Sequence, residues 1–310
     1  MAKIAVIVLN YRQPTLTLAT VRSLLKISLE EASYHLFLVN NNCLDDSLNI
    51  FEEKLADNPK ITLVSTGSNL GYAGGNNFGI KLALKEGYDY CLIINNDVLV
   101  DPKFLQYLYK TAKNTVTPAI IGPKIYFAKG YEFHHDRYQN KELGRVIWSA
   151  GGLIDWKNIY ASNLGVDQVD RGQFDQINSN LDFITGCCLL IPKEIFHKIG
   201  FFDERYFMYL EDVDFCYRAK LQGFKIIYQP KSSIWHINAG SSSSGSSLHD
   251  YFITRNRLLF GLKYARPRSK LALTRQAVRL LFTGRKWQKR AVIDYYLKHL
   301  GKGSWREISL

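Results

Sequence analysis

The first 125 residues alternate short apolar runs with helical patterns, and this alternation constrains the fold more than any other feature of the chain. The runs read as strands buried on both faces, because they lack a polar side. They are IAVIVLN (4–10), HLFLVNN (35–41), ITLVST (61–66) and YCLIINN (90–96). Helices are expected at 14–25, from 45 or 46, at 76–86 and after 101–102. Strands that alternate with helices predict a parallel α/β sheet, whose ligands bind at the carboxyl ends of the strands.

The rest of the chain is less regular. Residues 144–155 and 159–163 predict a β-hairpin or an extended flap, and 182–192 predicts a buried strand followed by a helix at 192–199. A helix is expected at 211–223, ending at a glycine, and two short strands at 224–230 and 232–237. The Gly/Ser stretch 239–247 is typical of a linker or an active-site lid. Three basic helical segments follow, at 249–264, 268–283 and 286–300.

The charge of the chain is concentrated at its C-terminal end. Residues 250–310 hold fifteen Lys or Arg against three acids, which gives +12, the net charge of the whole chain. Basic residues mixed with large apolar ones suit an amphipathic platform on an anionic membrane surface. A solvated helical cap and an element that forms a homodimer are the alternatives. Because the chain shows no recognisable nucleic-acid module, we expect no nucleic-acid partner.

The cysteines and the N-terminal sequence indicate the cellular compartment of the protein. The chain has five cysteines, an odd number, without zinc-ligand spacing, which predicts reduced thiols in a cytosolic protein. MAKIAVIVLNYRQP is apolar for only a few residues and is interpreted as a first strand rather than a signal peptide. No apolar run approaches the roughly 18 residues of a membrane span. The expected location is cytoplasmic, with peripheral contact at the inner face of the cell membrane if the basic end binds lipid.

Polar residues follow the fourth predicted strand. Side chains two apart on a strand share one face, so Asn95 and Asp97 are expected to point together. Their oxygens suit a hard divalent ion that also holds phosphates. The alternative interpretation is a polar turn, which Asn and Asp favour.

The glycine-rich segment NLGYAGGNN (69–77) lies between a predicted strand and a predicted helix. Its glycines allow the backbone to approach a ligand closely, and the helix start accepts negative charge. The segment is neither Gly-x-Gly-x-x-Gly nor a P-loop, so a dinucleotide or ATP site is not indicated.

Acidic residues open the helix predicted at 211–223. Glu211, Asp212 and Asp214 in its first turn either stabilise the helix dipole or supply a general base. His236 ends a strand-like run, where it is either a structural residue or a neutral imidazole on the same metal as Asp97.

Taken in order, these segments resemble the inverting family 2 glycosyltransferases, especially the bacterial rhamnosyltransferase-like group. The similarity spans residues 3–245, and DYFITRNRLLF (250–260) continues it. The segments that carry it are VIVLNYRQ, VNNNCLDDS, NLGYAGGNNFGI, IINNDV, DFITGCCLLIPKEIF, IGFFDERYFMYLEDVDFCYRAKLQGFKI and IWHINAGSS. Each segment is modestly specific, but the ordered set is highly specific and favours the functional interpretation of each.

The resemblance implies a GT-A fold, with a Rossmann-like, mostly parallel sheet flanked by helices. It divides the chain into a catalytic domain, 1–248, and a basic helical C-terminal extension, 249–310. Within the catalytic domain, 1–125 is expected to bind the nucleotide sugar and 126–248 the acceptor.

The resemblance also assigns site residues. Asp97, third in an Asp-x-Asp-like motif, and His236 would hold Mg²⁺ or Mn²⁺. Glu211 and Asp212 match the family's acidic pair, with Asp212 as the base. The nucleotide sugar would lie along a set of residues from the first four strands and the glycine-rich segment: Leu9, Asn10, Tyr11, Asn40, Asn41, Asn69, Gly71, Gly74, Gly75, Asn95 and Asn96.

Two positions depart from the family's pattern. The family often has Asp-Asn after the second strand, where Asn40-Asn41 stands here, and an amide both donates and accepts hydrogen bonds. The metal motif starts with Asn95 rather than an aspartate. The first departure leaves the identity of the donor's nucleobase open, and the second predicts a weaker metal site.

The activity implied is the transfer of a sugar, with inversion, from a nucleotide diphosphate to a hydroxyl of a glycan or lipid-linked acceptor in surface polysaccharide biosynthesis. TDP-rhamnose or a UDP-sugar is the expected donor. One rival function is a sugar nucleotidyltransferase, whose glycine-rich loop after the first strand is replaced here by Asn10-Tyr11-Arg12-Gln13. The other is a non-catalytic binding module, in which loss of Asp97, Asp212 or His236 would be expected.

Overall fold

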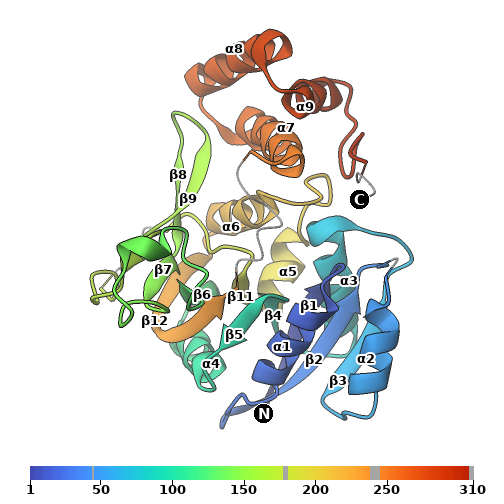
Figure 1. Ribbon diagram of the computed structural model, residues 1–310, viewed down its shortest axis with the longest axis vertical. Helices are drawn as coiled ribbons and strands as arrows, with labels where there is room; N and C mark the ends of the chain where they lie inside the picture. The colour runs from blue at the N-terminus through green and yellow to red at the C-terminus, as the bar shows by residue number, and fades with distance from the viewer. Residues whose placement is uncertain (44, 177–180, 238–244, 307–310) are drawn as a thin grey trace.

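The computed structural model describes residues 1–43, 45–176, 181–237 and 245–306 (Figure 1). In this part of the chain, one curled sheet of ten strands forms the centre, with helices on both of its faces. Its main path runs in the order β10-β7-β6-β11-β4-β1-β2-β3, and β12 joins it by pairing with β6. The α/β architecture predicted from the sequence is confirmed.

The first half of the sheet is parallel. β1 pairs with β2 and β4, and β2 pairs with β3, all in parallel register. The strands are β1 (Ala2–Asn10), β2 (Ala32–Asn40), β3 (Ile61–Ser65) and β4 (Tyr90–Asn95). The helices that follow them are α1 (Pro14–Leu24), α2 (Ser47–Leu55), α3 (Gly71–Lys85) and, after β5, α4 (Phe104–Asn114). All eight predicted elements are present, within a few residues of their expected bounds except at the start of α3.

Both faces of this half-sheet are buried, as its apolar runs require. Along β1, Val6 and Val8 pack with α1, α2 and α4, whereas Ala5 and Ile7 pack with α3. Successive side chains of a strand point to opposite faces, so a continuous apolar run is stable only between two layers of helices.

The second half of the sheet is largely antiparallel. β11 pairs antiparallel with both β4 and β6, and so joins the two halves. The added strands are β5 (Val98–Val100), β6 (Ala119–Phe127), β7 (Val146–Ser149), β10 (Gln168–Val169), β11 (Cys188–Pro192) and β12 (Lys225–His236). The strand predicted at 182–192 is therefore shorter than expected. The two short strands predicted after 223 are one strand, β12, with an irregularity between Gln229 and Ser233.

Shorter elements complete the part of the chain before residue 247. The predicted hairpin is confirmed as β8 (Gly152–Asp155) and β9 (Tyr160–Asn163). The 3-10 turn η1 (His135–Arg137) lies before β7. The predicted helices at 192–199 and 211–223 are α5 (Lys193–Ile199) and α6 (Glu211–Leu221), which lie on the same face of the sheet as α3.

The three predicted basic helices are also present: α7 (Ser247–Tyr264), α8 (Pro267–Thr283) and α9 (Lys286–Tyr296). They form a helical cap at one end of the molecule (Figure 1). Most of the predicted Gly/Ser linker lies outside the described residues, but its last residue begins α7, capped by the Ser246 hydroxyl. All five cysteines are free thiols. No described helix is long and apolar enough to span a membrane.

Candidate active site

The candidate site lies at the carboxyl ends of the parallel strands. Asn10 ends β1 directly opposite Asn40, which ends β2, and Asn95 ends β4 opposite Leu9. Neighbouring parallel strands end at the same edge of a sheet, so residues far apart in the sequence are brought together there.

A buried hydrogen-bond network forms the floor of this edge. The Asn10 amide donates to Asn40 Oδ1 (3.1 Å) and its oxygen accepts from the Thr17 hydroxyl (2.8 Å). Asn96 Nδ2 in turn donates to that hydroxyl (2.9 Å), so the segment after β4 is tied to β1 through α1. Asn10 and Asn40 are buried, so they support the surface of the site from below.

Asn41 fastens the glycine-rich segment to the end of β2. Its Oδ1 accepts from the Leu70 amide (3.1 Å) and the Thr66 hydroxyl (3.2 Å). Its Nδ2 donates to Asn69 Oδ1 (3.1 Å) and to the Gly71 carbonyl (3.2 Å). Both the oxygen and the nitrogen of the Asn41 side chain are therefore engaged by other groups of the protein.

The helix after the glycine-rich segment begins earlier than predicted. The sequence placed its start near Asn76, but α3 begins at Gly71, whose amide donates to Asn69 Oδ1 (2.9 Å). Gly71 has φ +70°, and a β-carbon there would lie 2.5 Å from the Phe207 carbonyl oxygen. Only glycine combines this backbone conformation with this approach, so a helix can start where the composition suggested a loop.

Two further glycines of the segment lie inside α3 rather than in an open loop. A β-carbon on Gly74 would lie 2.8 Å from the Leu70 side chain, and one on Gly75 would lie 2.5 Å from Leu9. Gly75 thus lets α3 pack closely against β1, and Gly74 leaves room for the Leu70 side chain.

Tyr11 directly follows Asn10 at the end of β1. It is half-buried, and the Arg12 guanidinium lies 5.3 Å from the centre of its ring. Cys43, which the sequence did not single out, accepts from the Arg12 amide (3.1 Å) and the Asn10 amide (3.3 Å). The thiol joins the loops that follow β1 and β2.

Asp97 and His236 meet at the end of β4, although 139 positions separate them in the chain. Asp97 lies in the turn between β4 and β5 rather than on a strand face with Asn95, because β4 ends at Asn95. Its Oδ1 is 3.2 Å from His236 Nε2, and its carbonyl accepts from the Ile237 amide (2.7 Å). The His236 ring packs 4.6 Å from the ring of Trp148.

The chemistry of this pair fits a divalent cation shared with a phosphate-bearing ligand. Asp97 Oδ1 and His236 Nδ1 are buried without a hydrogen-bond partner in the structure. No group of three or more His, Cys, Asp and Glu side chains suited to a metal occurs among the described residues. Mg²⁺ commonly uses one or two protein ligands together with substrate phosphates, so two ligands suffice only for a shared ion.

The acidic pair opens α6 across from this turn. Asp212 Oδ2 accepts from the Gly186 amide (2.6 Å) and its Oδ1 from the Val213 amide (2.8 Å). Glu211 is almost fully buried, and its Oε2 has no hydrogen-bond partner. Burial raises the pKa of both carboxyl groups, and the charge of Asp212 raises that of Glu211 further. The pair is therefore suited to accepting a proton.

The third acid of the motif has a structural role. Asp214 is fully buried and pairs with Arg218 (2.7 Å) and Lys263 (3.4 Å). It also accepts from the hydroxyls of Tyr206 (3.2 Å) and Tyr264 (2.9 Å). Asp214 thus joins α6 to α7, and the acidic motif divides into a candidate pair and a packing residue.

Tyr72 was missed by the sequence analysis, although it lies within the glycine-rich segment. Its hydroxyl donates to the Gly186 carbonyl (2.5 Å), and a β-carbon on Gly186 would lie 2.8 Å from its oxygen. Burial raises the pKa of Tyr72, and the charges of Glu211 and Asp212 raise it further. Tyr72 and Asp212 therefore hold Gly186 from its two sides.

Cys187 connects the acidic pair with the Asp97 turn. Its carbonyl accepts from the Asn95 amide (2.9 Å). The preceding residue, Gly186, donates to Asp212, and Asn95 lies two residues before Asp97. Burial raises the pKa of the Cys187 thiol, and the charges of Asp97 and Asp212 raise it further. The structure thus gathers the predicted metal ligands and the predicted base around one short segment, Gly186-Cys187.

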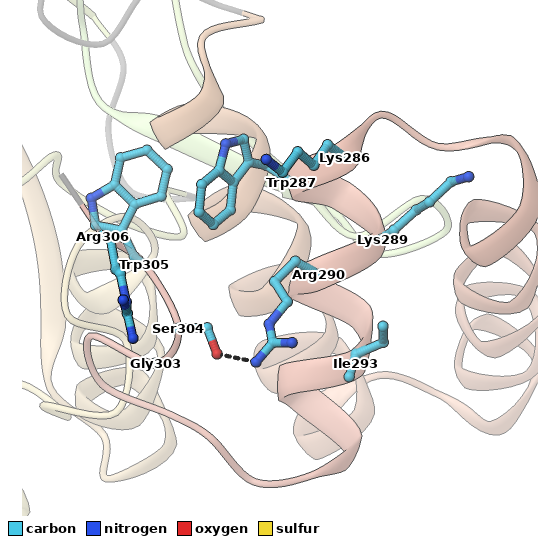
Figure 2. A pocket seen from close by; sticks show the side chains of 9 residues that line it. All are labelled: Lys286, Trp287, Lys289, Arg290, Ile293, Gly303, Ser304, Trp305 and Arg306. Atoms are coloured by element: carbon cyan, nitrogen blue, oxygen red, sulfur yellow. Dashed lines mark hydrogen bonds between the residues drawn. The ribbon is translucent and has the colours of Figure 1, made fainter. Parts of the chain in front are cut away.

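A basic cavity lies away from this site. It measures about 620 Å³ and lies between α9 and the C-terminal segment (Figure 2). Its charged lining residues are all basic: Lys286, Lys289, Arg290 and Arg306. None of the residues predicted for the active site lines this cavity.

Comparison with known proteins gives a consistent result. A sequence model described as "Glycosyltransferase like family 2" matches residues 2–261. A low-salt glycan biosynthesis hexosyltransferase of Haloferax volcanii is 29% identical over 201 residues, which cover 64% of this chain and 59% of the relative. An N-acetylglucosaminyl-diphospho-decaprenol L-rhamnosyltransferase of Mycobacterium tuberculosis is 26% identical over 199 residues, covering 62% and 63%. The match therefore spans about three fifths of each relative.

Two solved structures share the fold. A mannosyltransferase from Pyrobaculum calidifontis in complex with GDP-Man and Mn²⁺ has a TM-score of 0.54 and 12% identity, and the match covers 98% of this chain and 76% of that one. GalNAc-T7 with UDP, GalNAc and Mn²⁺ has a TM-score of 0.60 and 14% identity, with 96% and 58% covered. At these identities the similarity establishes the fold alone.

Proposed function

Because this chain belongs to glycosyltransferase family 2 and has the GT-A fold, we propose that it transfers a sugar, with inversion, from a nucleotide diphosphate to an acceptor hydroxyl. The observation that carries this proposal is the meeting of Asp97, His236 and the Glu211–Asp212 pair around Gly186-Cys187. The acceptor is a glycan or a lipid-linked sugar of surface polysaccharide biosynthesis, and the donor is TDP-rhamnose or a UDP-sugar. The names of the relatives, a glycan hexosyltransferase and a lipid-linked rhamnosyltransferase, support these classes.

Asp212 is the proposed base. Inversion requires a single displacement at the anomeric carbon, in which the acceptor hydroxyl loses its proton as it attacks. Asp212 is half-buried, whereas Glu211 is almost inaccessible, so Asp212 is the carboxylate that a hydroxyl can reach. The amides of Gly186 and Val213 fix its orientation.

Asp97 and His236 are the proposed ligands of Mg²⁺ or Mn²⁺. The buried Oδ1 of Asp97, in the turn after β4, and the imidazole of His236, at the end of β12, would supply a carboxylate and an imidazole ligand. When bound, the ion would neutralise the charge of the departing diphosphate. The two solved structures that share the fold contain Mn²⁺, which supports a divalent ion of this kind.

The nucleotide is proposed to lie over the carboxyl ends of β1, β2 and β4, in residues 1–125. In this arrangement Asn10, Asn40 and Asn41 shape the floor, while half-buried Tyr11 and Asn95 lie nearer to solvent. The acceptor would bind within 126–248, next to Asp212. Residues 249–310 form the helical extension in this scheme, and its α7 packs against α6.

Nucleoside diphosphates should stabilise the folded protein in a metal-dependent manner. At a concentration 100 times its dissociation constant, the correct diphosphate should add about 2.7 kcal/mol to the free energy of unfolding. A thermal-shift panel of UDP, TDP, GDP and CDP, each with and without Mn²⁺ or Mg²⁺, measures this. Stabilisation by one diphosphate, enhanced by metal, identifies the nucleobase of the donor. If no diphosphate shifts the Tm at saturation, the donor site is absent and the non-catalytic binding module is the better interpretation.

The outer face of α8 supports the proposed contact with a membrane surface. Leu271, Val278 and Phe282 are 52%, 49% and 76% exposed, and the spacing of four and seven residues places them on one face. That face lies opposite buried Leu273 and Ala277. It also carries three arginines, at positions 268, 275 and 279.

The charge around this face fits anionic lipid. Between residues 251 and 306 the only acid is Asp294, which is fully buried and bonded to Tyr251 and Ser304. The exposed surface of α8 and α9 is therefore basic and apolar, the composition of helices that lie in the membrane interface. Two copies that met through this face would bring arginines together, so a homodimer through α8 is disfavoured.

Changing Leu271, Val278 and Phe282 together to Ser should abolish binding to vesicles of anionic lipid. The exposed side chains can be removed without opening the core, and their insertion supplies the apolar part of the affinity. Sedimentation with anionic and with zwitterionic vesicles measures it. Val116 and Leu221, which are also exposed, provide a matched Ser control. Wild-type protein that ignores anionic vesicles, or a triple variant that binds as well as wild type, would contradict this contact.

A further inference from the structure

The backbone that leads into the acidic pair has an unusual conformation. Phe207, Tyr209 and Leu210 have φ values of 65°, 66° and 68°, and Leu210 immediately precedes Glu211. Left-handed backbone costs a non-glycine residue about 1–2 kcal/mol. Three such residues in four positions persist only where surrounding contacts over-determine the chain.

Asn256 of α7 supplies the largest set of these contacts. It is fully buried, and its Nδ2 donates to the carbonyls of Tyr206 (2.9 Å), Met208 (2.7 Å) and Tyr209 (2.8 Å). One amide group therefore binds three carbonyls of the turn 206–210. These bonds satisfy backbone carbonyls that would otherwise be buried without a partner.

Arg255 supports Asn256. Its Nε and Nη2 donate to Asn256 Oδ1 (3.1 and 3.0 Å), and Nη2 also donates to the Tyr206 carbonyl (2.9 Å). Its Nη1 donates to the Gly301 carbonyl (2.6 Å) beyond α9. Arg255 is fully buried, with no carboxylate of the described chain at ion-pair distance, so its donors are directed to backbone carbonyls and to Asn256. A buried charge used in this way fixes the positions of the groups it binds.

The other side of the turn contacts the start of α3. The Ala73 amide donates to the Phe207 carbonyl (3.0 Å), and Gly71 packs against the same oxygen. Tyr72 lies between these two residues. Its hydroxyl donates to the Gly186 carbonyl, and the Gly186 amide donates to Asp212. The turn 206–210 is therefore clamped between α7 and the helix that lines the candidate site.

We propose that Asn256, supported by Arg255, is a positioning residue that sets the first turn of α6 so that Asp212 faces the acceptor. This inference rests on the proposed role of Asp212 as the base. If the turn relaxed to right-handed or extended backbone, the direction of α6 at Glu211 would change. Asn256 touches neither predicted ligand of the metal nor the floor of the nucleotide site, so its effect is confined to the geometry of the base.

Asn256→Asp tests the proposal with the smallest change of shape. The carboxylate still accepts from Arg255, which neutralises its charge, but it can no longer donate to the three carbonyls. We expect kcat to fall by about 100-fold, the effect of displacing a catalytic group by roughly 1 Å. The KM of the donor and the thermal shift produced by the matching nucleoside diphosphate should remain as in wild type. Should Asn256→Asp fail to fold, Asn256→Ser, which retains one donor, replaces it.

The control is Leu258→Ala in the same helix. Leu258 is 2% exposed in the main core, and its truncation should cost about 2–5 kcal/mol of stability without touching the turn. At a temperature well below the Tm of both the wild type and Leu258→Ala, the control should retain wild-type kcat. A purely structural Asn256 would behave like the control, which would overturn the proposal. Asp212→Asn distinguishes failure of the base assignment from failure of the positioning role. If Asp212→Asn is active, Asp212 is not the base. If Asp212→Asn is inactive and Asn256→Asp has normal kcat, only the positioning role of Asn256 is wrong.

Discussion

Asp212→Asn is expected to lower kcat by about 10²–10⁴-fold, the contribution of a general base, while leaving the affinity for the donor unchanged. The amide has nearly the shape of the carboxylate but cannot take the proton of the acceptor hydroxyl. Steady-state kinetics with a purified donor and acceptor, together with nucleoside diphosphate titrations, measure both quantities. Loss of nucleotide binding along with activity would contradict the assignment.

The pH dependence provides a second measurement of the same group. Burial raises the pKa of Asp212, so protonation is favoured in the folded protein. A base acts only when ionised, and activity should therefore fall as the pH decreases through this raised pKa, above the ordinary value of about 3.9. The acidic limb should disappear from the residual activity of Asp212→Asn.

Glu211→Gln is the matched comparison. Glu211 is almost fully buried next to Asp212, and its raised pKa favours its neutral form, so Glu211→Gln keeps the shape of the side chain and leaves the base in place. Its kcat should fall less than that of Asp212→Asn. A larger loss in Glu211→Gln would reverse the roles of the two acids.

Asp97→Ala is expected to eliminate the metal-dependent part of nucleoside diphosphate binding. The variant removes the carboxylate that lies beside His236, and neutral ligands alone hold Mg²⁺ or Mn²⁺ weakly. The thermal shift caused by the diphosphate with Mn²⁺ should fall to that seen without metal. Transfer should decrease by a factor of about 100 or more, because the charge of the leaving diphosphate is then unopposed.

Asp101→Asn is the control for this variant. Asp101 lies four positions further along, and its carboxylate accepts from the Lys103 amide at the start of α4. Its replacement should leave the metal-dependent shift as in wild type. A metal-dependent shift that survives in Asp97→Ala would show that the ion is held elsewhere, and His236→Ala would then test the second ligand independently.

The order of elements was predictable because local patterns determine it. β1 is a continuous apolar run, and Pro14 begins α1 where its fixed backbone dihedral suits a helix start. The predicted bounds of the first strand and helix differ from the observed ones by at most two residues. The basic helices α7, α8 and α9 were likewise predicted from periodicity and charge.

The start of α3 could not be predicted from local pattern. Four glycines within the first nine residues of a helix oppose helix formation by composition, at roughly 1 kcal/mol each. The helix forms because Asn41 holds the preceding loop and because Leu9 and Phe207 occupy the space that side chains would need. Residues far apart in the sequence supply these contacts.

The sequence alone determined the family, the α/β order and the identity of the polar residues at the strand ends. These follow from periodicity and from motifs in which each residue lies near its neighbours in the chain. The resemblance had already placed Asp97 and His236 together, and the structure shows them in contact. Only tertiary contacts reveal that Asp214 is a packing residue and that Asn256 holds the turn before Glu211. Each of these contacts joins segments whose distance in space depends on how the sheet curls and where α7 docks, and no local pattern records that distance.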